Sequence, residues 1–78
     1  MAIATETLTG IRPRLLQRAY ELSGSTHAGE DLVQEAYLRY LTQPPRPAPK
    51  TERDLLRWFR SVLVSIWADQ HTRPLARR

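Results

Sequence analysis

The fold of this chain is decided by the stretch DLVQEAYLR at residues 31–39. Its apolar residues recur at helical spacing, which predicts an amphipathic helix over about residues 26–42. The side expected to face the core carries Leu32, Val33, Ala36, Tyr40 and Leu41. Another face, at spacing i, i+3, i+4 and i+7, carries Asp31, Gln34, Glu35 and Leu38. Taken alone, that second face is most simply ordinary solvated helix surface.

A helix is also predicted before this stretch, over about residues 9–23. Its apolar stripe contains Leu8, Ile11, Leu15, Ala19 and Leu22. Pro13 is tolerated because proline fits the first turn of a helix, where no backbone N–H is required. Gly24 is the expected left-handed residue after the end of this helix, and Ser25 or Thr26 is the expected N-cap of the next.

The last predicted helix follows a connector with four prolines at residues 43–50, a composition that favours an extended path. The sequence Thr51-x-x-Asp54 resembles a capping box, so we expect the helix to begin there. It should run to about Thr72, with Pro74 ending it. The residues expected to face the core are Leu55, Phe59, Val62, Leu63, Ile66 and Trp67. A different side carries Arg53, Arg57 and Arg60.

These patterns predict an all-α fold of three helices, and 78 residues allow a single small core. The core is expected to come from Leu15, Ala19, Leu22, Val33, Ala36, Tyr40, Phe59, Val62 and Ile66. The formal net charge is +4, and all but one of the twelve basic residues are arginine. Residues 25–45 carry net −2 and residues 46–78 net +5, which indicates two partners of opposite charge.

No pattern of catalytic residues is present: the chain has neither a glycine-rich phosphate loop nor a nucleophile with a base at suitable spacing. There are no cysteines, and His27 and His71 lack the spacing of a zinc site, so we predict neither metal nor cofactor. No apolar run approaches the length of a membrane span and no signal-peptide pattern is visible. The sequence therefore predicts a cytoplasmic protein that is not an enzyme.

Two motifs in this order resemble region 2 of bacterial sigma factors. Residues 31–39 resemble the D-L-[VI]-Q-E-x-x-[LI] signature of region 2.2, most closely in the extracytoplasmic-function class. Residues 58–70, WFRSVLVSIWADQ, resemble W-[IL]-R-Q-A-I-T-R-x-I-A-D-Q of primary sigma factors. The resemblance covers about residues 10–73, and it implies a three-helix sigma region 2 domain.

The resemblance also implies a role for each polar face. In the sigma family, the region 2.2 face docks on the clamp-helix coiled coil of the RNA polymerase β′ subunit, which assigns docking to Asp31, Gln34, Glu35 and Leu38. The last helix contacts the promoter −10 element, which assigns DNA contact to Arg57, Trp58, Arg60, Ser61, Val64 and Arg73. Ser61 and Val64 replace the glutamine and threonine that touch bases in the family. The docking motif is therefore kept, whereas the base-reading motif is reduced.

The 78 residues are expected to form one region 2-like domain, with a core over about residues 9–73 and no region 4. The leading hypothesis is a stand-alone region 2 subunit that docks on β′ and contacts −10 DNA weakly, with a partner protein supplying region 4. An alternative is a sigma mimic that binds an anti-sigma factor or the polymerase without reading DNA. A third hypothesis is a generic helical domain whose basic helix binds an acidic protein or an anionic membrane.

Overall fold

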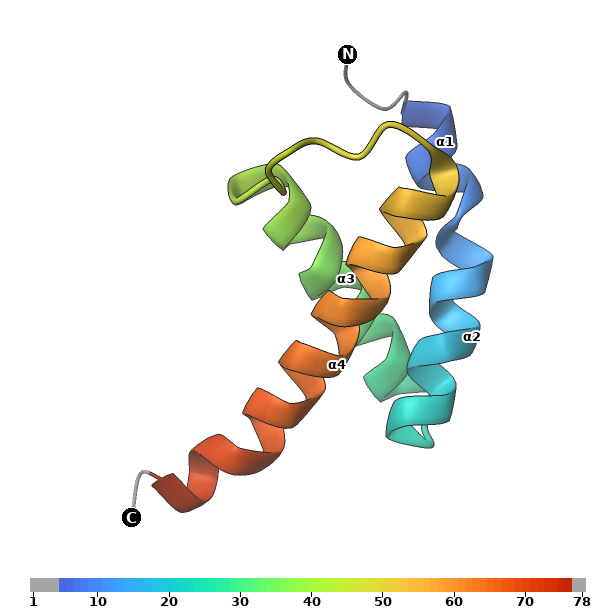
Figure 1. Ribbon diagram of the computed structural model, residues 1–78. Helices are drawn as coiled ribbons and strands as arrows, with labels where there is room; N and C mark the ends of the chain where they lie inside the picture. The colour runs from blue at the N-terminus through green and yellow to red at the C-terminus, as the bar shows by residue number, and fades with distance from the viewer. Residues whose placement is uncertain (1–4, 77–78) are drawn as a thin grey trace.

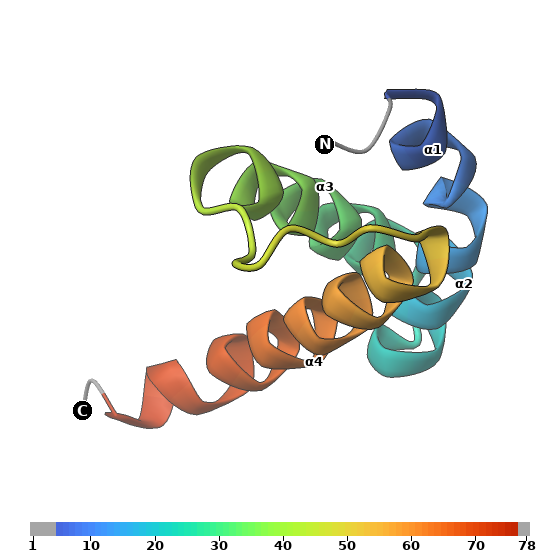
Figure 2. The same ribbon diagram turned by 45° about the horizontal axis from the view of Figure 1, so that its top comes forward.

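The computed structural model describes the backbone of residues 5–76 and the side chains of residues 6–70. It contains four helices, α1 (Thr5–Gly10), α2 (Arg12–Ser23), α3 (Thr26–Thr42) and α4 (Glu52–Ala76), and the described residues form no strand. The predicted all-α class is confirmed. Helices α2 and α3 form a hairpin and α4 crosses over them, with its C-terminal half extending beyond the bundle (Figures 1 and 2).

The first predicted helix is in fact two, so the prediction of a single helix before Gly24 was wrong. The division falls at Ile11, between α1 and α2, and Pro13 lies in the first turn of α2. Proline has no backbone N–H and its ring crowds the carbonyl four residues earlier, so a regular helix cannot run through this position unchanged. Ile11 itself is fully buried, so the residue between α1 and α2 packs in the core.

The predicted helix boundaries are confirmed where a cap defines them. Gly24 has φ 73°, and its N–H donates to the Tyr20 carbonyl at 2.7 Å, so glycine is needed to end α2 without strain. Ser25, rather than Thr26, caps α3: its side-chain oxygen accepts from the Ala28 N–H at 3.2 Å. Thr51 caps α4 in the same way, accepting from the Asp54 N–H at 3.1 Å.

The predicted end of the last helix was wrong. Helix α4 continues through Pro74 to Ala76 instead of ending near Thr72. A proline removes one backbone donor, and so close to a helix end that loss interrupts few of the hydrogen bonds that hold the helix. The side chains of residues 71–76 lie outside the described part of the chain, and Arg73 is among them.

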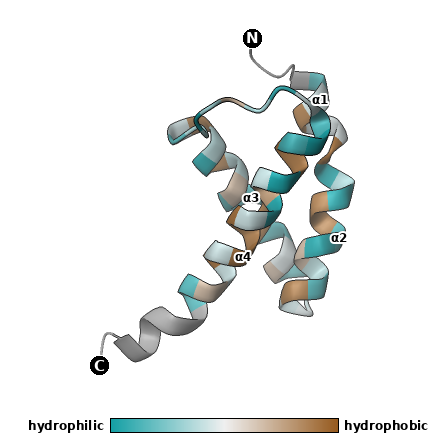
Figure 3. Ribbon diagram, viewed as in Figure 1, coloured by the Kyte–Doolittle hydropathy of each residue, from teal (hydrophilic) through white to brown (hydrophobic). Residues whose placement is uncertain are grey.

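The core lies where α2, α3 and α4 meet. The fully buried side chains belong to Ile11, Leu15, Ala19, Leu32, Val33, Ala36, Leu55, Phe59, Leu63 and Ile66. Of the nine predicted core residues, Leu22, Tyr40 and Val62 are only partly buried. Apolar and hydrophilic segments alternate along α2 and α4, as expected of helices that each bury one side (Figure 3). Leu41 contradicts its prediction: it is 72% exposed, because it lies three residues after Leu38 on the exposed face of α3.

Aromatic rings join α3 to α4 at this crossing. The Phe59 ring lies with its centroid 5.1 Å from that of Tyr37, 5.6 Å from Tyr40 and 5.0 Å from Trp58. The Tyr37 hydroxyl donates to the Leu8 carbonyl and so ties α1 to α3. These contacts fix the orientation of α3 relative to α4, and with it the positions of the exposed surfaces of both helices.

Candidate functional site

The exposed side of α3 forms a groove, here called the α3 groove. It has a volume of about 630 Å³ and is lined by Asp31, Gln34, Glu35, Tyr37, Leu38, Leu41 and Gln70. All four residues that the sequence assigned to docking line it, and all four are exposed. Leu38 is 58% exposed, and with Leu41 it places two large apolar side chains beside the two carboxylates. The α3 groove therefore presents both charged and apolar surface to a partner.

Three groove residues were missed by the sequence reasoning. Leu41 had been placed in the core, but it lies three residues after Leu38 and shares its exposed face. Gln70 comes from α4, so no local sequence pattern links it to the α3 residues that line the same groove. Tyr37 also lines the groove. Burial raises the pKa of its phenol above the ordinary value of 10.0, partly opposed by the Arg12 guanidinium, so at neutral pH the hydroxyl remains a donor.

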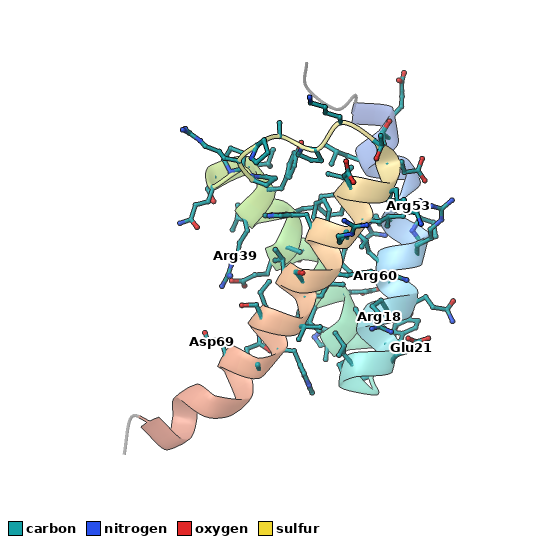
Figure 4. The ribbon with its side chains drawn as sticks, viewed as in Figure 1. Arg18, Glu21, Arg39, Arg53, Arg60 and Asp69 are labelled. Atoms are coloured by element: carbon teal, nitrogen blue, oxygen red, sulfur yellow. The ribbon has the colours of Figure 1, made fainter. Side chains whose placement is uncertain are left out.

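The basic side of α4 carries exposed Arg53, Arg57 and Arg60, as the sequence predicted. Together with Leu56 they line a shallow hollow of about 290 Å³, here called the middle hollow. Arg53 and Arg60 lie on the side of α4 nearer α2, whereas Arg39 of α3 lies on the other side of α4 (Figure 4). Acidic residues also lie on this side, because Glu52 pairs with Arg14 and Asp54 lines a hollow with Arg57.

Trp58 lies between the aromatic core and the proline-rich connector. Its ring is partly buried and makes edge contacts with Tyr40, at a centroid distance of 5.6 Å, and with Phe59. It lines a hollow of about 390 Å³, here called the linker hollow, with Arg57, Ser61, Asp54 and residues 45–49. The connector does run extended over this end of α4 (Figure 2). The partly buried indole and the Arg57 side chain therefore line the same hollow.

The residues assigned to DNA contact are thus only partly gathered together. Trp58, Arg57 and Ser61 share the linker hollow, and Arg60 lies in the adjoining middle hollow. Val64 is 45% exposed farther along α4. Among the described residues no cluster of His, Cys, Asp or Glu is suited to hold a metal ion, and no helix is long and apolar enough to cross a membrane.

The fold and its surfaces define a helical binding domain with an acidic, partly apolar groove on one side and a row of arginines on another. The family model for Sigma-70 region 2 matches residues 9–77, and the chain belongs to this family. No curated protein and no solved structure matched it in the corresponding searches. Membership implies a sigma-factor-like role in transcription initiation, in a non-enzymatic family that interacts with RNA polymerase and promoter DNA.

Proposed function

We propose that this domain docks through the α3 groove on the clamp helices of the RNA polymerase β′ subunit and contacts promoter −10 DNA through α4. The observation that carries the proposal is the α3 groove itself, in which all four docking residues are exposed on one surface. Contact with the −35 element belongs to region 4 in the sigma family. The proposal includes a partner protein that makes the further promoter contacts.

The chemistry of the groove supports a basic, amphipathic partner helix. Asp31 and Glu35 are one helical turn apart, so their carboxylates can face successive arginines of the partner. The exposed surfaces of Leu38 and Leu41 would lose water on docking and supply the apolar centre of the contact. Gln34 adds an amide that can both donate and accept a hydrogen bond.

The chemistry of α4 supports contact with DNA phosphates more than with bases. Arginine guanidinium groups pair bidentately with phosphate oxygens, and Arg57 and Arg60 are both exposed. Trp58 is only partly buried and lines the linker hollow, where a base of a melted strand can contact its ring. Ser61 is short and Val64 apolar, so neither can match the bidentate base contacts of longer amides.

The docking proposal is tested by measuring the affinity of the domain for a β′ clamp-helix fragment. We expect Gln34→Ala to weaken binding and Glu35→Arg to weaken it more, because reversal adds like-charge repulsion to the lost contact. The matched control is Glu30→Arg, which makes the same charge change on the same helix at an exposed position outside the α3 groove. Unchanged affinity in both groove variants, with the fold intact by circular dichroism, would remove the docking assignment.

A second candidate function is the sigma mimic, which binds an anti-sigma factor or the polymerase without reading DNA. The observation that favours it is the partial burial of Trp58 among Tyr40 and Phe59, which gives the ring a structural role independent of DNA. A transcription assay with promoter DNA and the region 4-bearing partner distinguishes the two candidate functions. The mimic binds the same polymerase fragment but gives no −10-dependent transcript.

A further inference from the structure

The C-terminal end of α4 projects away from the other helices. Gln70 lines the α3 groove, and beyond it the backbone continues as helix to Ala76. Residues 71–76 therefore extend about 9 Å past Gln70. Figures 1 and 2 both show this end of α4 leading away from α2 and α3. A helix that continues in this direction does not turn back into the α3 groove of its own molecule.

The sequence of residues 71–78, here called the C-terminal segment, is complementary in charge to the α3 groove. The segment carries three arginines and no acidic residue, so its formal charge is +3. The groove contains the carboxylates of Asp31 and Glu35, and no basic residue lines it. Among the described residues, neither carboxylate forms a salt bridge. Arg73 and Arg77 are four residues apart in the sequence, which is also the spacing of Asp31 and Glu35.

We propose that the C-terminal segment of a second copy of this chain binds in the α3 groove. Its arginines would meet the two carboxylates, and Leu75 would meet the exposed Leu38 and Leu41, so the second copy supplies the basic, amphipathic partner that the groove favours. So short a segment buries too little surface for a permanent dimer, and we expect weak association that salt weakens further. Because the proposed β′ docking uses the same groove, a bound second copy excludes the polymerase. That consequence rests on the proposed function, whereas the self-association does not.

The test measures self-association of the 78-residue chain by sedimentation equilibrium at about 50 mM and about 500 mM salt. We expect Glu35→Arg and Arg77→Glu each to raise the dissociation constant about tenfold at the lower salt concentration, because each reversal brings like charges together in the groove. The matched controls make the same charge changes elsewhere. Glu30→Arg lies on α3 outside the α3 groove, and Arg53→Glu lies near the other end of α4. Both controls should leave the dissociation constant within about twofold of that of the unsubstituted chain.

Mixing the two groove-directed variants tests which surfaces meet. The Arg77→Glu chain keeps an unchanged α3 groove, and the Glu35→Arg chain keeps an unchanged C-terminal segment. An equal mixture should therefore associate more tightly than either variant alone. The inference is overturned if the unsubstituted chain stays monomeric, if the two variants associate as tightly as their controls, or if the mixture associates no more tightly than its components.

Binding of the β′ clamp-helix fragment separates this inference from the proposed function. If the chain self-associates as described but does not bind the fragment, the docking proposal fails and the self-association stands. If the fragment binds and the chain is monomeric, the reverse holds. Where both occur, Arg77→Glu should bind the fragment more tightly than Arg53→Glu, which has the same net charge, at concentrations at which Arg53→Glu self-associates. Equal affinity of these two variants would refute competition for the groove.

Discussion

Replacing Phe59 by alanine tests whether one ring holds α3 and α4, which carry the two proposed binding surfaces, together. The Phe59 side chain is fully buried, and its ring lies 5.0–5.6 Å by centroid from Trp58, Tyr37 and Tyr40. Truncating a buried phenylalanine costs about 3–5 kcal/mol through lost transfer free energy and the cavity left behind. The loss of three aromatic contacts places this site toward the upper part of that range.

That loss is large relative to the stability of so short a chain. At about 0.05–0.15 kcal/mol per residue, 78 residues give roughly 4–12 kcal/mol for the free energy of unfolding. We therefore expect Phe59→Ala to lose at least about a third of the free energy of unfolding, and to be near its unfolding midpoint where the parent stability lies at the lower end of that range. Phe59→Leu is the matched variant, because it keeps most of the apolar volume and should cost less than about 2 kcal/mol.

The assay is urea unfolding followed by far-ultraviolet circular dichroism, with the fluorescence of Trp58 and Trp67 as a second probe. Phe59→Leu keeps the reasoning testable even where the alanine variant fails to fold. A decrease of less than about 1 kcal/mol for Phe59→Ala, with an unchanged m-value, would contradict the claim that this ring is central to the core. A shift in tryptophan emission that precedes the loss of helix would show that the packing around α4 opens first.

Four further outcomes are expected. Binding of the isolated chain to duplex DNA should be weak and should fall steeply with salt; a titration showing tight, salt-insensitive, sequence-specific binding contradicts this. Trp58→Ala, in a domain that circular dichroism shows to be folded, should abolish transcription with the region 4-bearing partner while sparing β′ binding, and surviving transcription would favour the mimic. Gly29→Leu should destabilise the fold by about 1–3 kcal/mol in thermal unfolding, because a Cβ at that position meets the Tyr20 ring at 2.9 Å. Gly10→Ala should not destabilise it, because a Cβ there has nothing within 4 Å. Burial raises the pKa of Tyr37 in the folded state. The stabilising contribution of Tyr37 is therefore complete below pH 10 and is lost as pH rises through the folded pKa. Tyr37→Phe should flatten that part of a curve of unfolding free energy against pH.

The sequence alone determined the all-α class and the polar face of α3, but neither the break between α1 and α2 nor the end of α4. Hydrophobic spacing predicts helices because an amphipathic helix repeats every 3.6 residues. Gly24 and Ser25 mark boundaries because left-handed backbone and N-cap hydrogen bonds are local requirements that the residues themselves satisfy. The i, i+3, i+4, i+7 spacing from Asp31 to Leu38 likewise fixes a shared face before any tertiary contact forms.

Tertiary structure decided which of these faces are covered. Leu41 continues the apolar pattern of α3, yet it is exposed, because α4 packs on the side of α3 that carries Tyr40 and leaves the side of Leu38 and Leu41 uncovered. The partial burial of Trp58 depends on Tyr40 and on the path of the connector. The juxtaposition of Arg18 with Arg60 joins positions 42 residues apart, and no local periodicity records it. Local propensity acts over one or two helical turns, whereas the exposure of a face depends on how whole helices pack against one another.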